Sequence, residues 1–197
     1  MTVPGMPMAM RWLIEAPHWS SDDHELVLMA PPRTDWFVDP SGASPPVLSG
    51  PALVGDAGGD YLFSAKVTVE FAADFDAGVL MLHAGDSRWA KLCFEYSPQG
   101  QPMIVSVVTN GRSDDANAYD VDGNSTWLRV ARLGSAFAFH ASADGATWNL
   151  IRVFTLGEDV EPAVGFEAQS PTGDGCRVSF GDIRWRAARL ENLRDGS

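Results

Sequence analysis

The sequence has 197 residues, a size typical of a single domain, and its 45% hydrophobic and 20% charged content is that of a globular chain rather than a disordered one. The formal net charge of −12 would repel nucleic acids and anionic membranes, so neither is an expected partner. No segment approaches the roughly 20 apolar residues that span a bilayer, and the N-terminus lacks the basic-then-apolar pattern of a secretory signal, so we expect a cytoplasmic location.

The chain is expected to form one domain over residues 1–197, with a core from about 11 to 186. Residues 31–60 are rich in proline, glycine and aspartate, which favours a loop. A loop of this length is commonly functional, and the segment before it is too short to fold alone, so we interpret it as an excursion over the domain and not as a linker. The C-terminal tail RWRAARLENLRDGS is the best candidate for a helix, although it is short.

The dominant pattern between these segments is alternation of apolar and polar residues. It occurs in AKVTVEF from Ala65, in WAKLCFEY from Trp89 and in WLRVARL from Trp127. Such a period of two is typical of strands with one apolar face and one more polar, solvent-facing side. Turn-rich segments separate the strands at intervals of about 8–12 residues, which predicts an all-β sandwich or barrel.

The segment SADGATW, at residues 142–148, lies between two apolar stretches. Its residue types are similar to those of the aspartate box of sialidases, but it lacks the spacer between aspartate and glycine and occurs once. Asp144-Gly145 is a dipeptide favoured in two-residue type I′ turns, because both positions need positive φ. We therefore predict a β-hairpin with a type I′ turn here.

A longer stretch, DAGVLMLHAGDSRWAKLCFEYSPQGQPMIVSVVTNGRSDD, resembles the central block of the regulation-of-enolase-like family of domains of unknown function. Upstream APPRTDWFVDP and downstream WLRVAR, AFHASADGATWNLIRVF and AVGFEAQSPTGDGCRVSFGDI resemble further segments of that family in the same order. The resemblance extends roughly from Trp12 to Arg186. It implies a concanavalin A-like jelly-roll sandwich of two antiparallel sheets. This fold also occurs in lectins, glycoside hydrolases and sugar-binding modules, so it does not by itself define a function.

Neither the cysteines nor the histidines indicate a cofactor or metal site. Cys93 and Cys176 lie in strand-like runs, where buried free thiols are expected, with a disulfide as the alternative. The four histidines lack the spacing of a zinc site, and the acid pairs 22–23 and 114–115 are expected to be solvated turns, with a lectin-like calcium site as the alternative. We therefore expect no metal and no other cofactor.

The strand faces that carry polar side chains supply the candidate binding site. If neighbouring strands face the same way, their charged side chains form a stripe across one sheet, with the early loop at one end. Aromatic rings beside polar groups suit a sugar, whose C–H faces stack while its hydroxyls form hydrogen bonds. The predicted ligand-binding residues are Lys91, Glu95, Trp89, Trp36, Asp35, Arg129, His140 and Arg152. The alternative is a ladder of cross-strand ion pairs with tryptophans that serve as core anchors.

Catalysis is less expected than binding. Hydrolases of this superfamily carry an E-x-D-x-E run, which is missing here. Glu95 is the one acid on its strand, and Lys91 on the same face should keep it ionised, which is poor for a general acid. A second carboxylate would have to come from a loop, for example Asp35 or Asp76. No catalytic residue is therefore assigned.

The sequence thus favours a non-catalytic protein that binds a carbohydrate or sugar-derived metabolite on a concave sheet face. Arg129 and Arg152 would contribute if that ligand carries a phosphate or carboxylate. One alternative is a protein-interaction module that regulates a metabolic enzyme, and another is a sugar-active hydrolase or lyase.

Overall fold

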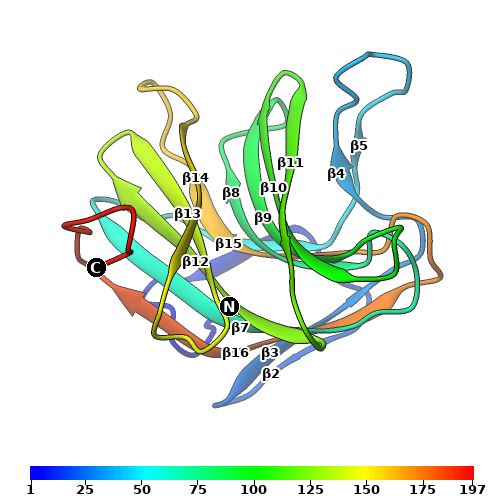
Figure 1. Cartoon of the computed structure of the whole chain (residues 1–197), viewed down its shortest axis with the longest axis horizontal. Coiled ribbons are helices and arrows are strands. Elements are labelled where there is room, and N and C mark those ends of the chain that lie inside the picture. The colour runs from blue at the N-terminus through cyan, green and yellow to red at the C-terminus, as the bar shows by residue number, and fades with distance from the viewer.

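The computed structural model describes residues 1–197 as two seven-stranded antiparallel sheets with a small third sheet of two strands (Figure 1). The expected all-β sandwich of two antiparallel sheets is confirmed. No helix in the structure has the length and apolar character needed to cross a membrane.

The first sheet carries the features that matter most for function. Its strands, in spatial order, are β1 (Met10–Ile14), β6 (Ala52–Gly55), β15 (Ala163–Gln169), β8 (Ala77–His83), β9 (Arg88–Tyr96), β10 (Pro102–Asn110) and β11 (Ser113–Asp120). Every neighbouring pair in this sheet is antiparallel.

The second sheet packs against the first and contains most of the remaining strands. Its order is β14 (Asn149–Thr155), β13 (Ala136–Ser142), β12 (Ser125–Leu133), β7 (Tyr61–Glu70), β16 (Cys176–Arg186), β3 (Glu25–Ala30) and β2 (Trp19–Ser21). The predicted alternation is present in β7, where Ala65, Val67 and Val69 are all fully buried. Together with Leu92 and Phe94 of β9 they contribute to the main hydrophobic core of 30 buried residues.

The outer face of the first sheet is also apolar, which the alternation on β9 did not predict. A second cluster of 11 buried residues covers it and includes Trp89 and Cys93 of β9 together with Trp36 and Val38. The segment that supplies Trp36 and Val38 forms a hairpin of β4 (Trp36–Phe37) and β5 (Val47–Leu48), which Figure 1 shows beside β11. Reciprocal hydrogen bonds between Val38 and Ser113 attach this hairpin to the start of β11.

Two local predictions need correction. Residues 31–60 are not a plain loop, because they contain β4, β5 and β6, and β6 is an internal strand of the first sheet. The tail does not form a helix: β16 continues to Arg186, and Leu190 and Leu193 then pack on the second sheet against Leu62, Ala131 and Ala138. A short helix gains little stability by itself, so these apolar contacts decide the conformation.

The segment SADGATW joins the adjacent strands β13 and β14, as the hairpin prediction requires, but not through a two-residue type I′ turn. Only Gly145 of the Asp144-Gly145 pair has positive φ. The Asp144 carboxylate instead accepts hydrogen bonds from the backbone N–H groups of Ala146 and Thr147. Side-chain acceptance of these bonds stabilises a longer loop.

Candidate functional site

The outer face of the first sheet contains a pocket of about 440 Å³, which we call the Lys91 pocket. Its 13 lining residues are Asp35, Phe37, Phe75, Lys91, Glu95, Pro98, Met103, Val107, Asp115, Asn117, Gln169, Pro171 and Thr172. Its size lies within the range of about 300–1,000 Å³ typical of small-molecule sites.

Strand register explains why residues far apart in sequence meet here. Lys91 of β9 pairs with Val107 of β10, which in turn pairs with Asp115 of β11. Because side chains two residues apart share a face, Glu95 lies on the same face as Lys91 and Asn117 on the same face as Asp115. The structure therefore brings together Lys91, Glu95 and Asp35 from the predicted set.

Lys91 is the organising group of the pocket. Its side chain is only 2% exposed, and its Nζ donates hydrogen bonds to Asp35 Oδ1 at 3.0 Å and to Gln169 Oε1 at 2.7 Å. Burial lowers the pKa of Lys91, but the Asp35 carboxylate and other nearby acidic groups more than offset this effect and leave the pKa above its usual value. Lys91 is therefore a fixed, fully charged group.

Gln169 of β15 links Lys91 to other residues of the pocket through hydrogen bonds. Its Nε2 donates to the backbone oxygen of Phe75 at 3.2 Å and to Glu95 Oε2 at 3.5 Å, while its Oε1 accepts from Lys91. Both ends of the amide are thus engaged, which fixes its orientation. Sequence reasoning missed Gln169, because only the sheet pairing places β15 two strands from β9.

The expectation that Lys91 keeps Glu95 ionised is wrong. Burial raises the pKa of Glu95 to about 8, and this effect exceeds the opposing attraction of Lys91. Lys91 is already paired with Asp35, and the carboxyl groups of Asp115, Asp35 and Glu167 further disfavour a charge on Glu95. At neutral pH Glu95 is therefore mainly protonated and can donate a hydrogen bond.

Glu167 is a further acidic residue close to this network. It lies on β15, is fully buried, and neither carboxyl oxygen has a hydrogen-bond partner. Burial raises its pKa to about 8. An unpaired buried carboxyl is expected to stay neutral, because an isolated charge in this position would be costly.

The aromatic groups of the pocket differ from those predicted. Trp36 and Trp89 are 3% and 0% exposed and pack edge to face in the apolar cluster, so neither can stack on a ligand. The half-buried rings that line the pocket are Phe37 and Phe75. Phe37 follows Trp36 in an extended strand and so points the other way, which is a signal available in the sequence.

Phe75 has a backbone conformation that is uncommon for a bulky residue. Its φ of 69° lies in the left-handed region, and its N–H donates to the carbonyl of Tyr96 at 2.7 Å. Strain of this kind persists only where surrounding structure enforces it, and it is frequent at functional sites. No sequence pattern indicated this residue.

The other three predicted residues are separated from the pocket because they lie on the second sheet. The guanidinium of Arg129 stacks on Trp148 at 4.2 Å, and His140 Nε2 lies 2.9 Å from the Leu193 carbonyl. Burial lowers the pKa of His140 to about 4, so its neutral ring donates this bond. Arg152 of β14 is bound to Asp114. The proposed single stripe is therefore incorrect, since the strands belong to two sheets.

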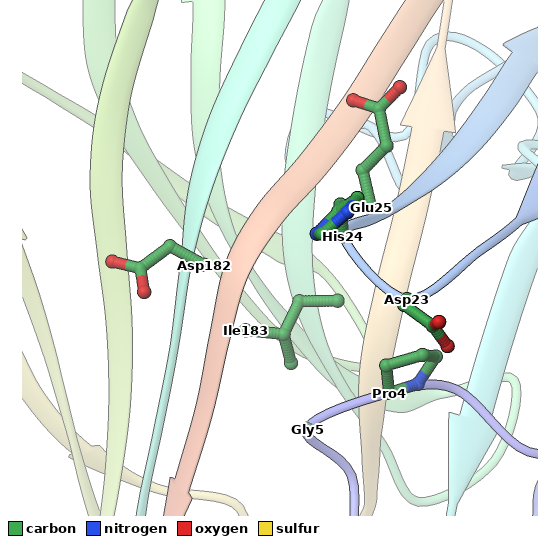
Figure 2. Close-up of a pocket in the computed structure, with 7 residues that line it drawn as sticks. All are labelled: Pro4, Gly5, Asp23, His24, Glu25, Asp182 and Ile183. Carbon is green, nitrogen blue, oxygen red and sulfur yellow. The ribbon is translucent and has the colours of Figure 1, made fainter.

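Other features of the surface are less suited to a ligand. A groove of about 280 Å³ is lined by Asp23, Glu25 and Asp182, among others, but Figure 2 shows the carboxylates of Glu25 and Asp182 pointing away from each other. Each carboxylate forms an ion pair with a different arginine: Glu25 with Arg177, and Asp182 with Arg184.

The remaining candidates for metal or redox chemistry are similarly engaged or buried. No three His, Cys, Asp or Glu side chains are grouped so that they could hold a metal ion. Cys93 and Cys176 are both free and buried. Asp76, considered as a second catalytic acid, is fully buried, and its Oδ1 accepts from the Ser170 hydroxyl at 2.6 Å. Asp35 and Asp115 instead place additional carboxyl groups in the pocket of Glu95.

The fold and pocket define a β-sandwich protein with a polar and aromatic cavity on one sheet. A family model described as a protein of unknown function, DUF1349, matches residues 12–188. The chain belongs to this family. It is 30% identical over 148 residues to Regulation of enolase protein 1 from Saccharomyces cerevisiae, which covers 75% of this chain and 74% of that protein. The resemblance to the regulation-of-enolase-like family is thus confirmed.

Solved structures share the fold. A functionally unknown protein from Saccharomyces cerevisiae has a TM-score of 0.84 at 25% identity, with 92% of this chain and 97% of that chain covered. The GH43 BlXynB protein from Bacillus licheniformis has a TM-score of 0.71 at 16% identity, covering 91% of this chain and 37% of that one. An alginate lyase from Klebsiella pneumoniae has a TM-score of 0.56 at 12% identity, covering 86% and 84%. The last two similarities concern the fold alone.

Proposed function

We propose that this protein binds a carbohydrate in the Lys91 pocket. The observation that carries the proposal is the pairing of two half-buried rings, Phe37 and Phe75, with hydrogen-bonding groups held in place by a buried lysine. Aromatic surface beside a few fixed polar groups is what a sugar requires, because its C–H faces are apolar and its hydroxyls need partners.

Each part of the pocket has a distinct role in this proposal. The ring of Phe37 or Phe75 stacks on the apolar face of the sugar. Glu95, Asp115 and Asn117 form hydrogen bonds with its hydroxyls. Lys91 acts mainly by fixing Asp35 and Gln169, since two of its three protons are already used. Preorganised partners of this kind lower the entropic cost of binding.

The fold comparisons support the proposal in a limited way. Two of the matched structures are named as a GH43 protein and an alginate lyase, and so as proteins that act on sugars. Their similarity shows a shared fold, so the argument for a sugar ligand comes from the residues of the pocket.

The test is calorimetric titration with xylobiose, cellobiose and mannobiose. We expect one or more to bind the wild type, and Phe37→Ala and Glu95→Gln each to weaken that binding at least about tenfold, which is the effect of losing about 1.4 kcal/mol. Trp19→Ala, which removes an exposed ring of the second sheet, is the matched control and should bind normally. Absence of binding by all three disaccharides, or equal affinity of the wild type and the pocket variants, would contradict the proposal. Analysis of the mixtures for cleaved products tests hydrolase or lyase activity.

A second candidate function is regulation of a metabolic enzyme through a protein contact. It is favoured by the 30% identity to a protein named Regulation of enolase protein 1. The test is to measure enolase activity and complex formation by sedimentation, with enolase from the same organism. A change in either would support regulation, and no change in both at micromolar concentrations would count against it.

A further inference from the structure

The Lys91 pocket leaves carboxylate oxygens of Asp35 and Asp115 free to accept hydrogen bonds. Asp35 uses its Oδ1 for Lys91 and for its neighbouring backbone N–H, which leaves Oδ2 free. Gln169 has both ends of its amide engaged. The Asp115 carboxylate lines the pocket, and no cationic side chain pairs with it. A ligand that donates hydrogen bonds therefore fits better than one that only accepts them.

The charges of the pocket have the same consequence. The positive charge of Lys91 is paired with Asp35 at 3.0 Å. Arg152, the other cation that acts on Asp115, is bound to the carboxylate and backbone oxygen of Asp114. Asp114 and Asp115 are consecutive on β11 and so point to opposite faces of the sheet. Burial keeps Glu95 largely protonated and also raises the pKa of Asp115, but Asp115 lines the pocket without an ion-pair partner, while Lys91 is paired with Asp35. Asp115 is therefore the carboxylate available to pair with a cation on a ligand.

We propose that the sugar bound in the Lys91 pocket carries a protonated amino group, with Asp115 as its counter-ion, and that sugar acids and sugar phosphates are excluded. This inference rests on the proposed carbohydrate binding and specifies its ligand class. An ammonium group offers several donors and a positive charge, which match the free acceptors and Asp115. A phosphate or carboxylate would face Asp115 and Asp35 without a free cation to receive it.

The overall charge of the protein acts in the same direction. A formal net charge of −12 attracts cationic ligands and repels anionic ones as they approach. The arginines that the sequence offered as partners for an anionic group, Arg129 and Arg152, lie on the other sheet. Anionic sugars therefore have neither long-range attraction nor a local partner in this pocket.

The test compares β-1,4-linked disaccharides that carry amino groups, no charge or a carboxylate. Cellobiose, the disaccharide of β-1,4-linked glucosamine, and cellobiose oxidised to a terminal glucuronate are titrated calorimetrically at about pH 6.5 in low salt. We expect the amino sugar to bind about three- to fivefold more tightly than cellobiose, as for one partly exposed ion pair, and the acid not to bind. Added salt should reduce the preference, because it screens exposed charges.

Two adjacent variants assign the effect to Asp115. Asp115→Asn should bring the affinities for the amino sugar and for cellobiose within about twofold of each other, as expected when one ion pair is removed. Asp114→Asn removes a neighbouring charge from the opposite face and should retain the preference. Binding of cellobiose without any preference for the amino sugar would overturn this inference and leave carbohydrate binding intact. Preference for the acid, or a preference that persists in Asp115→Asn, would also overturn it. Failure of all sugars to bind would overturn both proposals.

Discussion

The buried carboxyl of Glu167 gives a prediction about stability that does not depend on any ligand. Its side chain is fully buried without hydrogen-bond partners, and burial raises its pKa from 4.5 to about 8. The folded protein therefore binds this proton more tightly than the unfolded chain does. The contribution of Glu167 to the free energy of unfolding should be largest below about pH 4.5 and fall as the pH rises toward about 8.

The magnitude follows from the size of the pKa difference. Each unit corresponds to about 1.4 kcal/mol, so the interval from about pH 5.5 to pH 8 corresponds to at most about 3 kcal/mol. This value is an upper limit, because water penetration and relaxation reduce the cost of a buried charge. Glu167→Gln keeps the shape of the side chain and removes the titration, so the variant should lose less stability over this interval than the wild type.

Urea unfolding at about pH 5.5 and about pH 8.5 measures the effect. The free energy of unfolding should fall less between these two pH values in Glu167→Gln than in the wild type, by about 1–3 kcal/mol. Glu158→Gln is the control, because Glu158 is exposed and forms no ion pair, and it should behave as the wild type does. If Glu167→Gln loses as much stability as the wild type on going to high pH, the proposed neutral, buried carboxyl is wrong.

Three further predictions concern the same fold. Lys91→Met leaves the Asp35 carboxylate without its buried partner and should destabilise the protein by about 3–5 kcal/mol in urea unfolding; an unchanged midpoint would refute the role given to this pair. Gly165→Ala places a Cβ against the carbonyl oxygen of Leu53 on β6, so it should cost about 1–3 kcal/mol in thermal unfolding, and a neutral result would show that the two strands can separate slightly. The buried thiols of Cys93 and Cys176, whose pKa values burial raises, should react with a thiol reagent only as the protein unfolds, and rapid labelling of the native protein would contradict this.

Much of the architecture followed from local pattern. Alternation over β7, β9 and β12 predicted strands with the correct phase, because side chains in a strand alternate between faces whatever the tertiary context. The inward face of β9, with Leu92 and Phe94, was predicted correctly for this reason. The same logic failed for the opposite face, where Trp89 and Cys93 are buried under the β4–β5 hairpin, since alternation does not reveal a covering segment.

The sequence alone thus determined the all-β sandwich, the alternating core faces and the presence of charged residues on β9. Only the tertiary structure decided which of those residues meet, because strand order in a sandwich joins segments far apart in the chain. It placed Gln169 and Asp115 with Lys91 and Glu95, and it separated Arg129 and Arg152 onto the second sheet. It also decided the protonation state of Glu95, because the pKa of this carboxyl depends on its burial and on the pairing of Lys91 with Asp35. Neither is a local property of the strand.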